Sequence, residues 1–192
     1  SLGLDDSFNS LVAAIPTNAL VHAYLPGCGS LPSLESASEI EARSAFGLNY
    51  QRLLAFESVD GGFGASREAL PDVYHTAEAL NCLGELAPTT AVDEALVERT
   101  AKWLMDRQSP EGTWTPARIP SSWQSLPRIE LPGTAYVAWS LIEAGYGDAP
   151  EVRLAVEHLA RYPDKAHDSY VLALVANALH AYTQVQPEPL LD

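Results

Sequence analysis

The sequence predicts an all-α domain in which helices alternate between an outer and an inner layer. One observation is an internal repeat: a Gly-rich turn followed by a nearly charge-free segment occurs at 56–86, again at 107–145, and in degenerate form at 161–182. Repeats of this length indicate stacked supersecondary units that bury their faces against their neighbours. The other is that amphipathic segments alternate with segments that are apolar on every side, while the period-two pattern of strands is absent.

The expected elements follow from caps, breakers and periodicity. A first helix lies within residues 5–25 and is kinked or divided at Pro16, and Ser33 or Ser36 caps a second that ends near residue 57. The others are expected at 71–86, at 92–108 with Thr90 as its cap, at 134–144 closed by Gly145, at 150–161 with a capping box formed by Asp148 and Glu151, and at 168–183. The helices at 71–86, 134–144 and 168–183 are expected to be buried on all sides.

The segments that connect the expected helices are turns and one long loop, and none of them indicates a domain boundary. Residues 60–64 and 111–114 are turns whose glycines suit positive φ, and Phe63 anchors the first of them. The segment 115–132 holds four prolines and is longer than ordinary connections, which indicates a functional or vestigial insertion. We therefore expect one domain over 1–192, with a tail at 184–192 that frays.

Composition narrows the class of protein. The chain has 192 residues, 47% of them apolar and 19% charged, which is typical of a globular domain. Its net charge of −14 argues against binding to nucleic acid or to anionic membranes, and no apolar run is long enough for insertion into a bilayer. The acidic excess is most simply a solvated outer face.

The residues that could carry chemistry show no strong pattern. Cys28 and Cys82 form one disulfide in an exported protein or remain two free thiols, and their spacing does not decide between these. Cys28 has no local base or cation to activate it, and Cys82 is expected to be a small core residue. The five histidines lack metal-ligand spacing, so no metal or other cofactor is expected. Trp103 and Trp139 are expected to be core residues and not the walls of a lipid pocket.

Several phrases, in this order, resemble the thioester domain of α2-macroglobulins and complement proteins, most closely its bacterial members. The resemblance covers about residues 9–182. It is carried by the following segments: 16–25 (PTNALVHAYL), 50–57 (YQRLLAFE), 60–63 (DGGF), 103–108 (WLMDRQ), 112–114 (GTW), 134–139 (TAYVAW) and 170–179 (YVLALVANAL). The resemblance implies an α/α toroid, which in the family has six helical hairpins. The roughly seven helices expected here form only part of such a toroid.

Two departures from the family concern its reactive chemistry. The family forms a thioester between the Cys and the Gln of a Gly-Cys-x-Glu-Gln motif before the first helix, and supplies a His from the loop before the fifth. The matching stretch here reads Gly3, Leu4, Asp5, Asp6 and Ser7, without Cys or Gln, and the loop 115–132 contains no His. Acyl transfer by this route then has no nucleophile and no base.

The sequence thus predicts a non-catalytic structural or binding module within a larger protein of the protease-trapping, endopeptidase-inhibitor or complement-like class. The resemblance implies an extracellular or periplasmic location. The partners it implies are other domains of the same polypeptide, a protease or another protein. One alternative is an enzyme of the terpenoid cyclase or prenyltransferase group, which shares the toroid; the acidic Asp-x-Asp-Asp donor and the Asp/Cys/His zinc site of those enzymes are not recognisable. Another is an unrelated helical-repeat interaction module.

The loop 115–132 is the candidate interaction site. It combines aromatic, aliphatic and Arg side chains, which is the composition of an interface hot spot: Arg118, Ile119, Trp123, Leu126, Arg128 and Ile129. In the competing interpretation, Trp123 and Ile129 fold back to cover the helix ends. Exposure of Trp123 distinguishes the two.

Overall fold

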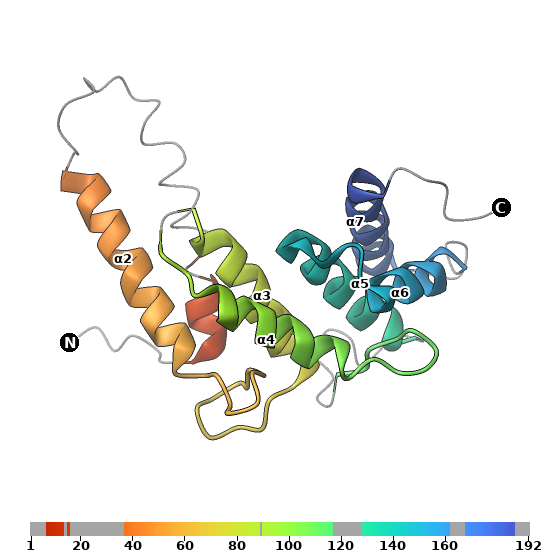
Figure 1. Cartoon of the computed structure of the whole chain (residues 1–192), viewed down its shortest axis with the longest axis horizontal. Coiled ribbons are helices and arrows are strands. Elements are labelled where there is room, and N and C mark those ends of the chain that lie inside the picture. The colour runs from red at the N-terminus through yellow and green to blue at the C-terminus, as the bar shows by residue number, and fades with distance from the viewer. Residues whose placement is uncertain are drawn as a thin grey trace, which may run out of the picture.

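The computed structural model describes residues 7–13, 15, 37–88, 90–116, 128–161 and 168–186. Within these ranges the structure is all-helical, and its only β feature is an isolated bridge between Glu57 and Phe63. The helices form an open arc with α2 and α7 at its two ends (Figure 1). The prediction of a partial α/α toroid is confirmed.

The elements follow the expected order. Residues 8–13 are helical, and the remaining elements are α2 (Ala37–Leu54), α3 (Val73–Leu86), α4 (Glu94–Met105), α5 (Glu130–Leu141), a π-helical turn η3 (Ile142–Tyr146), α6 (Pro150–Ala160) and α7 (Ser169–Val185). Several boundaries differ from expectation by a few residues: α2 ends at Leu54 instead of near residue 57, α3 begins at Val73 instead of Pro71, and α4 is shorter than 92–108. In addition, α5 begins before Thr134, and α7 extends into the tail that was expected to fray. Pro132 fits within α5 because it lies in the first turn, where a proline costs no helical hydrogen bond.

Aspartates cap three of the helices. The Asp72 carboxylate accepts a hydrogen bond from the His75 N–H at the start of α3, and Asp93 and Asp168 do the same for α4 and α7. The expected cap at Thr90 was therefore wrong, because the first turn of α4 begins three residues later. The expected capping box of α6 was also wrong: Ala149 occupies the N-cap without a side-chain hydrogen bond, and Pro150 starts the helix.

The first Gly-rich turn joins an outer helix to an inner one. Gly61 has φ of 92° and donates its N–H to the Ser58 carbonyl at 3.0 Å, while the Ser58 N–H donates to the Gly62 carbonyl at 2.8 Å. Phe63 is fully buried, and its N–H donates to the Thr76 hydroxyl on α3 at 2.9 Å. The turn is thereby fixed to the inner helix that follows it.

The second turn repeats this arrangement bond for bond. Gly112 has φ of 82° and donates to the Ser109 carbonyl at 3.0 Å, and the Ser109 N–H donates to the Thr113 carbonyl at 2.9 Å. Trp114 takes the place of the buried phenylalanine, and its N–H donates to the Thr134 hydroxyl on α5 at 3.0 Å. The repeat seen in the sequence is therefore a repeat of structure.

Each turn also packs against the next outer helix. A Cβ at Gly61 would meet the Arg99 carbonyl oxygen of α4 at 3.0 Å, and one at Gly112 would meet the Leu154 carbonyl oxygen of α6 at 2.8 Å. Glycine is required at both positions by backbone conformation and by this close approach. These contacts join successive hairpins along the arc.

Two of the three inner helices, α3 and α5, are mostly buried, but not on all sides as expected: Gly84 and Glu85 of α3 are exposed, and Tyr136 and Trp139 of α5 are half-buried. α5 packs against α3, α6 and α7, and most of its residues are buried, as are most of those of α3. The expectation that α7 is buried on all sides was wrong: Tyr170, Leu172 and Val185 are 49%, 41% and 48% exposed. α7 ends the arc, and in the described part of the chain it packs mainly against α5, with further contacts to α6 and η3.

A candidate binding site between two inner helices

Most of the candidate loop lies outside the described residues, including Arg118, Ile119, Trp123 and Leu126. The two remaining members, Arg128 and Ile129, precede α5 and are half-buried, and the Arg128 guanidinium donates to the Glu130 carboxylate at 2.7 Å. The exposure of Trp123 stays a prediction.

The region that corresponds to the thioester motif is likewise described only at its end. Gly3, Leu4, Asp5 and Asp6 lie outside the described residues, as does Cys28. The Ser7 hydroxyl accepts a hydrogen bond from the Ser10 N–H, which places Ser7 as the cap of the helix at 8–13.

Cys82 is a free, buried thiol on α3, as the core assignment predicted. Burial raises its pKa, with smaller contributions from the nearby Glu85 and Glu78 carboxylates. The thiol is therefore held in its protonated, unreactive form at neutral pH.

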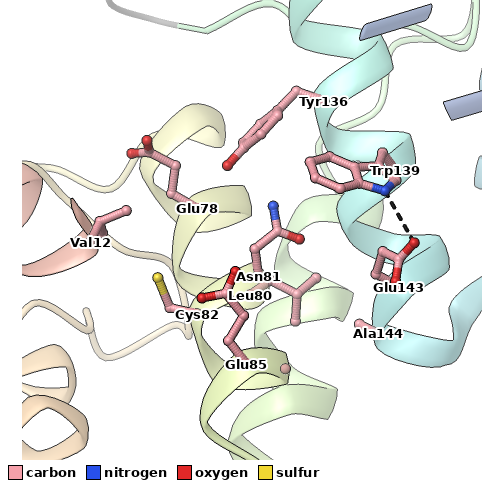
Figure 2. Close-up of a pocket in the computed structure, with 11 residues that line it drawn as sticks. Val12, Glu78, Leu80, Asn81, Cys82, Glu85, Tyr136, Trp139, Glu143 and Ala144 are labelled. Carbon is pink, nitrogen blue, oxygen red and sulfur yellow. Dashed lines mark hydrogen bonds between the residues drawn. The ribbon is translucent and has the colours of Figure 1, made fainter. Parts of the chain in front are cut away.

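A pocket of about 360 Å³ opens between the two inner helices α3 and α5 (Figure 2). Polar and apolar side chains share its lining: Val12, Glu78, Leu80, Asn81, Cys82, Gly84, Glu85, Tyr136, Trp139, Glu143 and Ala144. Its polar groups occur at matched spacings. α3 presents Glu78, Asn81 and Glu85 at i, i+3 and i+7, and α5 with the η3 turn that follows it presents Tyr136, Trp139 and Glu143 at the same spacing. One stripe of each helix thus faces the other.

On the α3 side, the central group is the carboxyl of Glu78. Burial raises its pKa, and a hydrogen bond with Tyr74 acts in the opposite direction. Its Oε2 atom is buried and has no hydrogen-bond partner. A buried carboxylate oxygen without a partner is costly, so a positive charge placed nearby would stabilise this group.

On the α5 side, the pocket is walled by aromatic rings. The rings of Tyr136 and Trp139 lie 6.0 Å apart at 64° to each other, and the Tyr74 ring stacks on Tyr136 at 5.6 Å and 28°. The Trp139 indole N–H donates to Glu143 at 3.1 Å. The expectation that Trp139 is a core residue was wrong: it is half-buried because one part of the ring packs on the core while the rest lines the pocket.

Trp139 and Glu143 also line a second, more open hollow of about 490 Å³ toward α7. Its α7 wall is formed by the polar side chains of Asn177, His180 and Gln184, together with Ala181 and Val185. The two hollows therefore share one wall on the inner helices.

The pocket offers groups that can contact a ligand. It combines two ring faces, an amide and three carboxylates, but its cysteine is not activated. No group of three or more His, Cys, Asp or Glu side chains that could hold a metal ion occurs among the described residues, and no helix in the described ranges is long and apolar enough to cross a membrane.

Sequence reasoning missed the pocket residues Glu78, Asn81 and Tyr136. The available signal was their spacing. α3 was recognised as almost free of charge, and its acidic side chains Glu78 and Glu85 lie on one face with Asn81. An all-apolar inner helix with one polar stripe indicates that the stripe faces a cavity or solvent.

Hairpins that repeat the same turn, with a buried aromatic residue fixed to the next inner helix, define an α/α-toroid domain. Comparison with known families specifies it further: residues 9–188 match the model of the A-macroglobulin TED domain. The chain belongs to this family, and the resemblance found in the sequence is confirmed.

Proposed function

We propose that this chain is a TED-type structural and binding module that lacks a thioester, within a larger protease-trapping or complement-like protein. The observation that carries the proposal is the stretch from Gly3 to Ser7, which has neither the Cys nor the Gln that a thioester joins. The absence of His from 115–132 supports the loss of the accompanying acyl-transfer step. Macroglobulin-type domains are generally extracellular and are parts of larger polypeptides, which supports an exported parent protein.

Reaction with an amine tests this proposal directly. A thioester is opened by methylamine, which remains attached to the glutamyl carbon and releases a thiol. We expect the intact mass of the protein to be unchanged after incubation with methylamine at native pH. A Cys28→Ala variant is the matched control: labelling of the wild type that this variant lacks would contradict the proposal and identify Cys28 as the acyl carrier.

We further propose that the segment 115–132 contacts a neighbouring domain of the parent protein. Its mixture of aromatic, aliphatic and Arg side chains supports this, and its prolines reduce the entropy lost on ordering it. Trp123→Ala is expected to leave the melting temperature of the isolated domain unchanged and to weaken association with the adjoining domains. A loss of several degrees in melting temperature, with the ring shielded from a fluorescence quencher, would show that the loop covers the core instead.

A further inference from the structure

The pocket between α3 and α5 has two aromatic walls that meet steeply. The face of an aromatic ring carries partial negative charge, so a cation placed against two such faces is attracted by both. Tyr136 and Trp139 supply these walls, and the Tyr74 ring stacks on Tyr136 and helps to fix its orientation. In Figure 2 the Tyr136 ring extends into the space between Glu78 and Trp139.

The charge of the pocket also favours a cation. Glu78, Glu85 and Glu143 all line it, and among the described residues that do so there is no Lys or Arg. The Oε2 atom of Glu78 is buried and has no partner. A cation in the pocket would lie close to this carboxylate and offset part of the electrostatic free energy that burial costs it, without contacting the buried Oε2 atom itself.

The size and the apolar lining define the kind of cation. A volume of about 360 Å³ lies near the lower end of the range for small-molecule sites, about 300–1,000 Å³. Val12, Leu80 and Ala144 add apolar surface, which suits methyl groups better than a strongly hydrated inorganic ion.

From these observations we propose that the pocket binds the alkylammonium group of a small molecule. Tyr136 and Trp139 contact the cation with their ring faces, and Glu78 provides the opposite charge. This inference is independent of the missing thioester, because none of these residues lies in 3–7 or in 115–132.

Choline and its neutral isostere, in which carbon replaces the quaternary nitrogen, provide a matched pair of probes. Both have the same shape, so the difference in their affinities measures the contribution of the charge. Titration of the intact chain, followed by NMR shifts of the indole N–H of Trp139, should show choline binding at least about tenfold more tightly. Equal affinities, or no binding of choline, would overturn the proposal.

Variants locate the site. Glu78→Gln keeps the shape of the side chain and is expected to weaken choline binding by about tenfold or more, whereas Glu98→Gln, at an exposed position of α4, should leave it unchanged. Trp139→Leu should also abolish binding, and its circular dichroism spectrum shows whether the fold is kept. Full choline affinity in a folded Glu78→Gln protein would refute the site.

The source of the ammonium group is tested separately. A peptide containing trimethyllysine and vesicles of phosphatidylcholine present the same cation on a macromolecule. Stronger binding of free choline than of either supports a small-molecule ligand. Binding of the peptide or the vesicles without binding of choline would overturn that assignment.

Discussion

Replacing Glu78 by Gln is expected to stabilise the domain at neutral pH. The substitution preserves the shape of the side chain and removes the charge whose burial raises the pKa of this carboxyl. Gln leaves an uncharged polar atom at the position of the buried Oε2, so the expected gain comes from the removed charge and not from satisfying a hydrogen bond. We expect a gain in the free energy of unfolding on the order of 1 kcal/mol at pH 7.

The direction of the pH dependence follows from the raised pKa. Below the ordinary Glu pKa of 4.5, the folded and unfolded chains are both protonated at Glu78, so its full contribution to stability is present. As the pH rises from there through the pKa of the folded state, the wild type loses stability because the folded chain resists ionisation. The difference between variant and wild type should thus be small at pH 4 and grow toward pH 7.

Other charges around Glu78 must be kept constant for this comparison to be clear. On α3 its neighbours are Tyr74, His75, Cys82 and Glu85, with Asp72 at the start of that helix. Tyr136 of α5 and Glu143 of η3 lie on the opposite side of the pocket. All of them are present in both proteins, so urea unfolding of the two at each pH isolates the substituted group. Glu98→Gln on α4 serves as the control for removal of an acidic charge. An equal or lower stability of Glu78→Gln at pH 7 would refute the account of this carboxyl.

The repeated turns and the buried aromatics make further predictions, all measurable by urea unfolding. Gly112→Ala should destabilise by about 1–3 kcal/mol, because its φ is 82° and the added Cβ would meet the backbone of α6. The control Gly84→Ala, in open space on α3, should be neutral or stabilise by up to about 1 kcal/mol. Equal effects of the two substitutions would contradict the role of the turn. Thr76→Val should cost about 1–3 kcal/mol, since it leaves the buried N–H of Phe63 without a hydrogen-bond partner. An unchanged denaturation midpoint would show that this hydrogen bond does not contribute to stability. Trp114→Ala should cost about 3–5 kcal/mol and Trp139→Ala clearly less; the reverse order would refute the assignment of Trp139 to the pocket wall.

Most of the fold could be predicted because local signals and burial agree. The repeated turn, the Gly positions and the apolar inner segments each occur in sequence order, and the structure places them as expected. The sequence places Phe63 and Trp114 in the turns. The hydrogen bonds from their N–H groups to Thr76 and Thr134, however, join residues more than a dozen positions apart in the sequence. Such pairings cannot be deduced from periodicity alone.

The pocket could not be predicted because it needs two helices at once. Glu78 on α3 and Trp139 on α5 are far apart in sequence, and an aromatic residue in an apolar segment is more often core than wall. The burial of α7 was wrongly predicted for a related reason. An apolar helix indicates that a partner exists, but not whether the described part of this chain provides it.

The central claim is that this TED-type domain holds no thioester, and a count of free thiols tests it most directly. The unfolded protein is titrated with a thiol reagent before and after treatment of the native protein with methylamine. Cys28 and Cys82 are the only cysteines, and Cys82 is a free thiol, so the account predicts the same count in both samples. A rise of one thiol after methylamine, together with a mass gain of one bound amine, would contradict it.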